Sequence, residues 1–208
     1  MPSDRSPQST SGAASALGSL QGLEAVLKQQ AGKGLPPVHL WNPPYCGDIG
    51  MRIAGDGTWF YQGSPIGRKP LVKLFSSVLR KDEDGRHYLV TPAEKVLVTV
   101  DDAPFMAVEM QVSGAGAGQT LTLRTHVDDI VECGREHPLR FGRDPRSDGL
   151  KPYLLVRGRL EALLTRTLYY DLVEIATIEA IAGLAQFGVW SGGVFFAMAP
   201  ASAIEGLA

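Results

Sequence analysis

Three arginines are the side chains of this sequence best suited to bind an anion. Arg68 and Arg166 stand near the starts of two predicted helices, and Arg157 follows the apolar run at 153–156. A guanidinium group can hold a phosphate or a carboxylate through two parallel hydrogen bonds. Because a cation at a helix N-terminus opposes the helix dipole, we expect both helix-start arginines to have partners. Those partners are either acidic residues of the chain itself or the anion of a ligand, and both interpretations stay open.

The charged residues of two short segments are the next candidates. The segment TPAEK contains Glu94 and Lys95, and the segment VDDAPF contains Asp102 and ends at Phe105. Each segment places charge beside a proline at the end of a predicted strand, where loops often carry function. The alternative is a structural turn in which a side-chain oxygen, that of an Asp, accepts backbone N–H groups. The sequence favours neither interpretation over the other.

Nucleophilic catalysis would need a different set of residues. Cys46 lies in the loop sequence PPYCGDIG, two residues before Asp48. A thiol becomes a nucleophile beside a base or a positive charge, and no histidine stands at a spacing that supports such a pair. A hydrolase that uses Cys46, or Asp48, Glu94 and Asp102 as acid and base, is therefore an alternative to the binding hypothesis.

No metal or cofactor site is predicted. His126, Cys133 and His137 lie close in sequence, but they lack the tight CxxC or HxxxH spacing that is typical of zinc sites. The glycine-rich run SGAGAGQ at 113–119 leads into the strand-like TLTLR. A phosphate loop opens a helix, whose N-terminal N–H groups face the anion. This run is therefore predicted to be a hairpin connector.

Composition limits the class of protein. The chain has 208 residues, is 44% hydrophobic and carries a formal net charge of −2, so a core can form and general nucleic-acid binding is disfavoured. Two cysteines and an N-terminus without a secretion signal predict a reduced, cytoplasmic protein. The stretch 180–204 has no formal charge, but glycines interrupt it and no Lys or Arg flanks it. We predict a buried β-hairpin there that turns near Ser191, Gly192 and Gly193, without membrane association.

Local patterns predict an α+β protein with two β-rich lobes. The first 37 residues are predicted to hold a disordered tail and a short amphipathic helix at 14–31. The N-terminal lobe is expected at 38–112 and the C-terminal lobe at 119–208. Asp56-Gly57 signals a β-hairpin over 51–62, and apolar residues at helical spacing predict a helix at 68–80. Strands are expected at 87–91, 96–100, 106–112 and 121–125.

The second half of the chain is predicted to repeat the first. Segment 139–156 resembles the strand, Asp-Gly turn and strand of segment 51–61, and a predicted helix at 166–179 corresponds to the helix at 68–80. The predicted unit is a β-hairpin, a helix and further strands, so that 48–100 and 137–198 would superpose.

Several spaced motifs also resemble one protein family. In order they are NPPYCGDIGMRI, DGTWFYQGSPIGR, LVKLFSSVLR, TPAEK, VDDAPF and PYLLVRGRLEALLTR, within about residues 38–200. This pattern is similar to that of a domain-of-unknown-function family of uncharacterised proteobacterial proteins. The resemblance implies a duplicated two-lobed fold, a C-terminal lobe like pleckstrin-homology domains, and a groove between the lobes for a nucleotide-type ligand in a signalling role. The motif residues here are Asn42, Pro43, Asp48, Trp59, Arg68, Thr91, Glu94, Lys95, Asp102, Pro104, Phe105, Arg157 and Arg166.

These observations lead to one expected site and three hypotheses. The site gathers charged residues around a groove between the lobes, with an aromatic ring for stacking: Arg68, Glu94, Lys95, Asp102, Arg157 and Arg166, with Trp59 or Phe105. We expect it to hold a small-molecule anion, a nucleotide among the candidates, in a signalling or stress response. The alternatives are the hydrolase described above and a scaffold whose groove receives a partner protein's peptide by strand addition.

Overall fold

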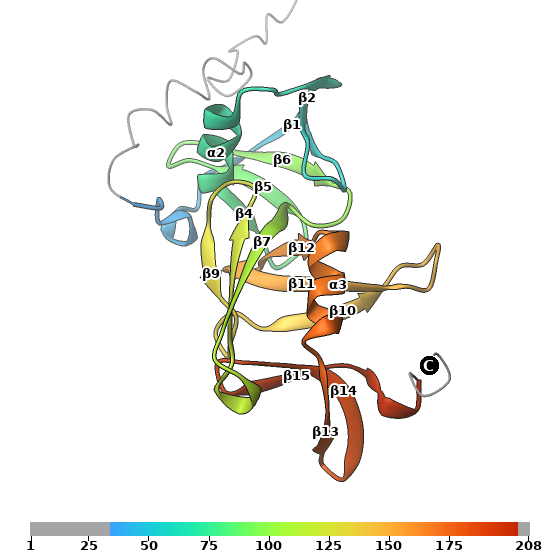
Figure 1. Cartoon of the computed structure of the whole chain (residues 1–208). Helices are drawn as coiled ribbons and strands as arrows, with labels where there is room; N and C mark the ends of the chain where they lie inside the picture. The colour runs from blue at the N-terminus through green and yellow to red at the C-terminus, as the bar shows by residue number, and fades with distance from the viewer. Residues whose placement is uncertain (1–33, 204–208) are drawn as a thin grey trace, which may run out of the picture.

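The computed structural model describes residues 34–203 of the chain. The predicted tail and the predicted amphipathic helix at 14–31 lie outside the described residues. Three sheets follow one another down the molecule, the first at the top of Figure 1, the second in the middle and the third at the bottom. The two predicted β-rich lobes and the α+β class are therefore confirmed.

The first sheet has six strands in the order β3-β2-β1-β6-β5-β4. Its elements are the 3-10 helix η2 (Val38–Leu40), β1 (Tyr45–Ile53), β2 (Trp59–Tyr61), β3 (Ser64–Pro65), α2 (Lys69–Ser77), β4 (Leu79–Lys81), β5 (His87–Val90) and β6 (Lys95–Val100). Neighbouring strands are antiparallel except for β1 and β6, which pair in parallel at the centre. The first and last strands of this lobe thus lie side by side.

Local chemistry explains the first hairpin and its helix. Gly57 adopts a positive φ of 83° in the turn between β1 and β2, and the Asp56 carboxylate accepts the N–H of Thr58 at 2.9 Å. The hairpin predicted from Asp-Gly is confirmed. Helix α2 buries Leu71 and Phe75 on one face. It ends at Ser77, earlier than predicted, because the chain becomes extended again at β4.

The second sheet has the same design as the first, with the order β10-β11-β12-β7-β8-β9. Its strands are β7 (Phe105–Ser113), β8 (Thr120–Thr125), β9 (Ile130–Glu132), β10 (Leu139–Arg143), β11 (Leu150–Arg157) and β12 (Leu160–Leu164), with the short 3-10 helix η3 (Gly116–Gly118) between β7 and β8. The first and last strands, β7 and β12, again pair in parallel at the centre. The glycine-rich run joins β7 to β8 as a hairpin connector, as predicted.

The duplication therefore relates different segments from those predicted. Both predicted segments do show strands, a helix and strands in that order. The strands of 137–198, however, are divided between the second and third sheets, whereas the similar sheets are formed by 45–100 and 105–164. Strand β12 already has β11 and β7 on its two edges, so no hydrogen-bonding edge is left there for the strands that follow. The predicted pairing of 48–100 with 137–198 was wrong for this reason.

The third sheet is a small three-stranded meander. It follows α3 (Arg166–Glu174) and consists of β13 (Thr177–Ile181), β14 (Leu184–Ser191) and β15 (Val194–Pro200), before the 3-10 helix η4 (Ala201–Ala203). Gly192 and Gly193 have positive φ angles of 56° and 72° at the turn between β14 and β15, so the predicted hairpin is confirmed. The helix predicted at 166–179 ends at Glu174, and the β-branched Thr177 and Ile178 begin β13 instead. Among residues 34–203, no helix is long and apolar enough to cross a membrane.

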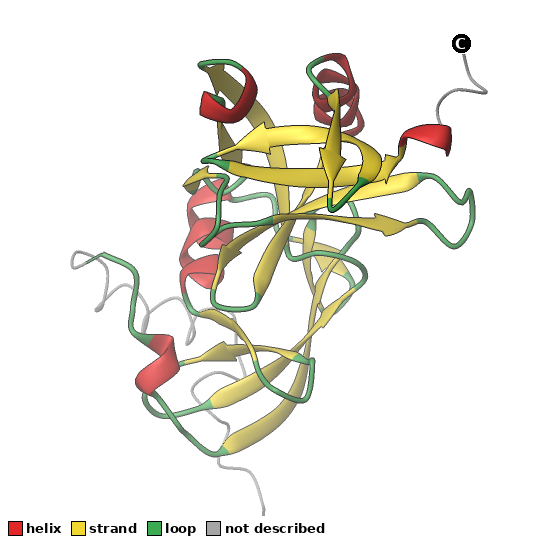
Figure 2. Cartoon of the chain, turned by 90° about the horizontal axis from the view of Figure 1, so that it is seen from below, coloured by secondary structure: helices red, strands yellow, loops and turns green. Residues whose placement is uncertain are grey.

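One hydrophobic core runs through both lobes. It includes Trp59 and Phe75 of the first lobe together with Phe105 and Leu123 of the second. The strands occupy the middle of the molecule in Figure 2, and the helices lie at its outside. The third sheet is attached through Ser191, whose hydroxyl donates to the Cys133 carbonyl at 2.6 Å and accepts the Leu121 N–H at 2.9 Å. The lobes are thus joined by buried contacts and hold the surfaces between them in fixed positions.

Candidate functional site

A cavity of about 950 Å³ lies where the two lobes meet. Three segments form most of its wall: 35–42 around η2, 79–84 in β4 and the turn after it, and 157–160 at the turn between β11 and β12. Its volume suits a small molecule, because ligand pockets typically measure about 300–1,000 Å³. The expected groove between the lobes therefore has a counterpart in the structure.

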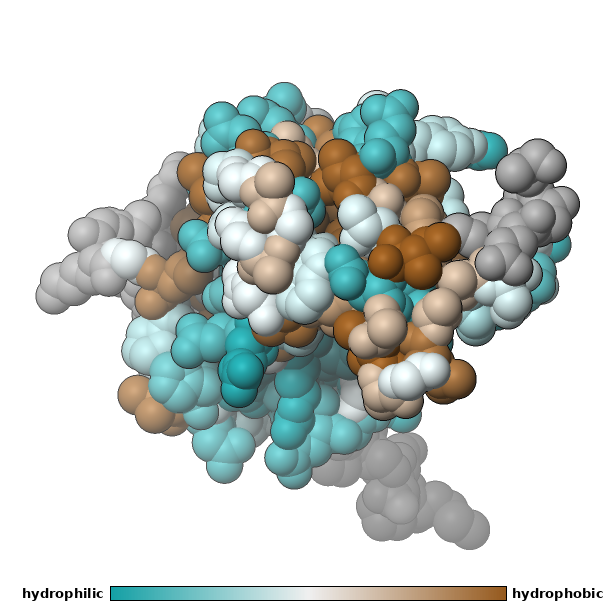
Figure 3. All heavy atoms as spheres, turned by 60° about the horizontal axis from the view of Figure 1, so that its bottom comes forward, coloured by the Kyte–Doolittle hydropathy of each residue, from teal (hydrophilic) through white to brown (hydrophobic). Residues whose placement is uncertain are grey.

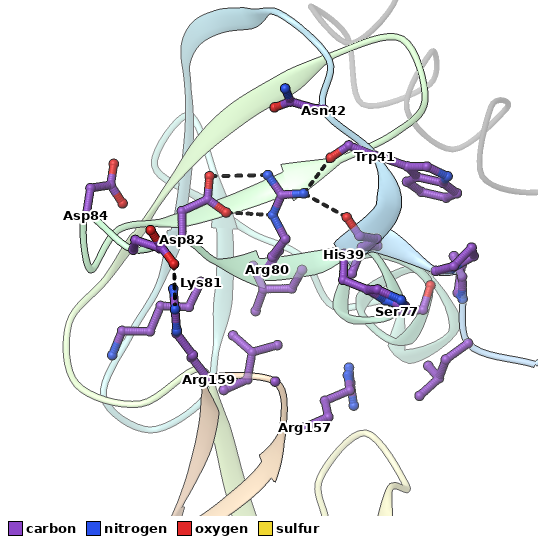
Figure 4. A pocket seen from close by; sticks show the side chains of 18 residues that line it. His39, Trp41, Asn42, Ser77, Arg80, Lys81, Asp82, Asp84, Arg157 and Arg159 are labelled. Atoms are coloured by element: carbon purple, nitrogen blue, oxygen red, sulfur yellow. Dashed lines mark hydrogen bonds and ion pairs between the residues drawn. The ribbon is translucent and has the colours of Figure 1, made fainter.

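One side of this cavity is built around Arg80. Its guanidinium bonds the Asp82 carboxylate, with the Nε to Oδ1 distance at 2.5 Å, and also donates to the carbonyls of Val38 and Trp41, each at 2.7 Å (Figure 4). The Lys95 ammonium reaches the same carboxylate at 3.0 Å. Burial alone would raise the pKa of Asp82, but the hydrogen bonds and charges of Arg80 and Lys95 outweigh it and lower that pKa. This network fixes segment 38–41 against β4.

Arg157 joins the second lobe to the first at the cavity wall. It forms an ion pair with Asp129, donates to the carbonyl of Ser76 at 2.8 Å, and lies over the Phe105 ring at 4.8 Å. Both charged side chains are about four-fifths buried, at 20% and 22% exposure. The partner of Arg157 is thus Asp129 of the chain itself, and the guanidinium is already engaged.

Two further cations on the cavity wall are held weakly. The Lys81 ammonium has no hydrogen-bond or ion-pair partner among residues 34–203. Arg159 reaches Glu83 at 3.0 Å, but the two side chains are 53% and 90% exposed, and such surface pairs contribute little. Figure 4 shows Lys81 and Arg159 on the same side of the cavity, apart from Arg157. For Arg159, an incoming anion would compete with the exposed Glu83 carboxylate, and Asp82 and Asp84 line the same cavity.

Lys81 also acts on a buried histidine. Burial, helped by the nearby Lys81 charge and opposed by Glu161 of the second lobe, lowers the pKa of His87 to about 4. His87 is therefore neutral at neutral pH. It contributes no charge to the cavity wall.

The six predicted charged residues are not gathered around one cavity. Arg157 lines the cavity between the lobes, and Lys95 supports it through Asp82. Arg166 instead lines a second cavity of about 400 Å³ in the C-terminal lobe and donates to the Tyr170 hydroxyl at 3.0 Å. Arg68 occupies the N-cap position of α2. Both helix-start positions were predicted correctly, but only one residue of the set lines the cavity between the lobes.

The remaining predicted residues have structural partners. Asp102 forms an ion pair with Lys151 and accepts the Tyr153 hydroxyl at 2.7 Å. In the TPAEK segment, the Thr91 hydroxyl oxygen accepts the Glu94 N–H at 3.1 Å, which is a structural turn like the alternative, with a Thr in place of an Asp. The turn interpretation thus fits TPAEK, whereas Asp102 ties two segments together.

The predicted stacking rings belong to the core. Trp59 is 1% exposed and packs against Phe75 with ring centroids 6.2 Å apart, and Phe105 is fully buried. A ligand cannot stack on either ring without displacing core neighbours. The half-buried Trp41 is an aromatic residue that does line the cavity.

The residues of the hydrolase alternative do not converge. The exposed Cys46 thiol donates to the Pro44 carbonyl at 3.5 Å, and Asp48 accepts the Gly50 N–H at 2.7 Å. Asp102 is engaged elsewhere, as described above. Across the described part of the chain, no group of three or more His, Cys, Asp or Glu residues could hold a metal ion.

Sequence reasoning missed Arg80, Lys81 and Arg159. Arg80 was assigned to the end of the predicted helix at 68–80, and Lys81 and Arg159 were given no role. A usable signal was present, because Arg157-Gly158-Arg159 places two cations around a glycine turn. What the sequence could not show is that this turn meets β4.

Comparison with known proteins identifies the family. Residues 36–103 match the N-terminal domain of the domain of unknown function DUF1285, and residues 104–198 match its C-terminal domain. No curated protein matches the chain.

Two solved structures are similar to this chain. The crystal structure of a DUF1285 family protein from Silicibacter pomeroyi DSS-3 has a TM-score of 0.81 and 49% identity, over 88% of this chain and 97% of that one. A DUF1285 family protein from Shewanella baltica OS155 has a TM-score of 0.48 and 26% identity, over 61% of this chain and 91% of that one. With both domain models matched in order, the chain belongs to the DUF1285 family.

Proposed function

We propose that this protein binds a small anionic ligand of nucleotide type in the cavity between its lobes, in a signalling or stress response. The observation that carries the proposal is the pair of cations Lys81 and Arg159 on the cavity wall, neither of which has a buried partner. The nucleotide type and the signalling role are taken from the family resemblance.

The cavity wall has the chemistry that such a ligand needs. Arg159 offers a planar guanidinium for two parallel bonds to a phosphate, and Lys81 offers a compact ammonium charge. The apolar Leu160 and the half-buried Trp41 line the same cavity, with the exposed amide of Asn42 beside them. A phosphate would be held by the cations, while a heterocyclic base would contact the apolar wall and the amide.

The rest of the wall is fixed before any ligand arrives. Arg80 holds segment 38–41 against β4, and Arg157 holds the turn between β11 and β12 against the C-terminal end of α2. A site whose walls need no ordering retains more of its contact energy as affinity.

A thermal-shift screen tests the proposal. The full chain would be heated with ATP, GTP, AMP, GMP and inorganic pyrophosphate, each at increasing concentration. A ligand that binds the native state at about 100 times its Kd stabilises by about 2.7 kcal/mol, which corresponds to about 5–10 °C for a chain of this size. We expect a nucleotide to exceed pyrophosphate, because pyrophosphate lacks the base.

Three variants locate the binding. Lys81→Ala and Arg159→Ala should each remove most of the shift, and Arg143→Ala is the matched control, since Arg143 is an exposed, ion-paired arginine outside this cavity. A shift that persists in both cavity variants, or no shift with any compound, would contradict the proposal.

A further inference from the structure

The free edge of the third sheet is the feature that the ligand site leaves unexplained. Among residues 34–203, strand β13 (Thr177–Ile181) pairs with β14 alone. Ile178 is 53% exposed, Ile181 39%, and Leu184 at the start of β14 65%. Figure 3 brings the bottom of the view in Figure 1 forward and shows apolar surface gathered on that face. An uncovered strand edge flanked by apolar side chains is a template for pairing with another strand.

The hairpin geometry shows which backbone groups face outward. Ile181 and Leu184 flank a two-residue turn in which Ala182 and Gly183 have φ angles of 49° and 80°. Residues flanking such a turn exchange hydrogen bonds, and the pattern alternates along the hairpin. Glu179 therefore bonds to Gln186, whereas the N–H and C=O groups of Ile178 and Ala180 point away from β14.

The other sheet edges in the described part of the chain are short, charged or covered. β3 has two residues and contains Pro65, β4 has three and carries Arg80 and Lys81, β9 has three, β10 carries Arg140 and Arg143, and β15 lies against β10 and ends at Pro200. These are the devices by which proteins prevent edge pairing. β13 has no Pro, Gly, Lys or Arg.

The charges near this edge indicate which partner can pair with it. Within 175–203 the only charged residue is Glu179, and its carboxylate accepts the Trp190 indole N–H at 3.0 Å. An acidic partner would be repelled, and the segment has no cation to attract nucleic acid or an anionic surface. A second β13 meets neither obstacle, provided that the two glutamates do not face each other. In an antiparallel pair centred on Ile178, each Glu179 faces the Thr177 hydroxyl of the other copy.

We propose that two copies of this protein associate through antiparallel pairing of β13 with β13, centred on Ile178. The outward N–H and C=O of Ile178 bond to those of Ile178 in the second copy, and the Ala180 N–H bonds to the Ala176 carbonyl. The two three-stranded sheets then form one continuous sheet across the two-fold axis. This pairing uses a different surface from the cavity between the lobes and does not depend on ligand binding.

Sedimentation velocity of the full chain, from about 5 to about 500 µM, tests the pairing. The wild type should shift from monomer to dimer within this range. Ala180→Pro removes an outward N–H without touching the β13–β14 bonds, so the dimer dissociation constant should rise at least about tenfold. Ala185→Pro is the matched control, because Ala185 faces Ala180 across the hairpin and lies beyond the last pair of β14 with β15. That variant should dimerise like the wild type.

A cross-link tests the register without a proline. In a Cys46→Ser background, Ile178→Cys should form a disulfide-linked dimer on mild oxidation, and Leu184→Cys should not. A wild type that stays monomeric at all concentrations would overturn the proposal, as would a dimer unaffected by Ala180→Pro in a variant with wild-type circular dichroism. A monomeric chain that instead sediments with phosphatidylcholine vesicles would assign the apolar edge to a lipid surface and also overturn it.

Discussion

The two sides of the cavity between the lobes use similar residues in different ways. On one side, Arg80 and Arg157 are largely buried and saturated by Asp82, Asp129 and backbone carbonyls. On the other, Lys81 and Arg159 meet only a solvated carboxylate or none. Arg157 and Arg159 are separated by a single glycine, so sequence position does not decide the role. Cations with several buried partners stabilise the cavity wall, whereas cations without buried partners are available to bind a ligand.

The largest expected effect on stability is on the side of the cavity where Arg80 and Arg157 are buried and paired. Arg157→Ala leaves Asp129 in a mostly buried position without its partner, and removes one of the donors to the Ser76 carbonyl. Because an unpaired buried charge is costly, we expect a loss of about 2–4 kcal/mol in the free energy of unfolding. Urea denaturation measures it, with Arg159→Ala as the comparison. Equal losses of stability for Arg157→Ala and Arg159→Ala would show that the two arginines do not differ in structural role.

The next effect is a pH dependence that depends on His87. Its pKa is about 4 in the folded chain against 6.5 for the free side chain. The unfolded state therefore binds more protons than the folded state between these values, so this contribution is complete above pH 6.5 and is lost as pH falls toward 4. We expect His87→Gln to reduce the pH-dependent loss of stability in this window by about 2–3 kcal/mol. Denaturation at pH 7.5, 5.5 and 4.5 would show it, and an unchanged profile would contradict a neutral buried His87.

Asp82 should give a smaller effect in a lower pH range. Its pKa is lowered below 3.8 in the folded chain, so its stabilising contribution is complete above that value and is lost as pH falls through the folded pKa. Asp82→Asn removes the carboxylate from between Arg80 and Lys95, and we expect a loss of about 1–2 kcal/mol at pH 7. The difference from the wild type should narrow as the pH falls below 3.8. A difference that is constant with pH would argue against an ionised Asp82 as the link.

The sequence predicted what local chemistry determines. The Asp56-Gly57 and Gly192-Gly193 turns have backbone requirements that specific residues meet, and both hairpins are where they were expected. The parallel pairs β1–β6 and β7–β12 join strands distant in the chain with no turn between them, and no local pattern signals them. For that reason, the wrong segments were matched in the predicted duplication.

The sequence predicted a groove between the lobes, but not most of the charged residues that line the cavity there. The groove between the lobes was expected, and Arg157 lines it. The partner of Arg157 is Asp129, 28 residues away in the chain, and Arg159 reaches Glu83 only because turns of the two lobes face each other. Residues such as Trp59 and Phe105 fit a binding motif and a core equally well, and burial alone distinguishes the two roles.

The smallest effect on stability is expected on the side of the cavity where Lys81 and Arg159 lie. Lys81→Ala and Arg159→Ala should each change the free energy of unfolding by less than about 0.5 kcal/mol, because neither residue has a buried partner. Their melting temperatures without ligand should match that of the wild type. A large loss of stability in either variant would show that the substituted residue stabilises the cavity wall, as Arg80 and Arg157 do.

The most direct test of this account is a calorimetric titration of the wild type and the Lys81→Ala/Arg159→Ala double variant with the nucleotide that gives the largest thermal shift. The account predicts saturable binding by the wild type and at least about a hundredfold weaker binding by the double variant, since two charge-assisted contacts of about 1.5 kcal/mol each are lost. The variant should otherwise melt like the wild type. Equal affinity in the two proteins would contradict the assignment of Lys81 and Arg159 as ligand-binding residues.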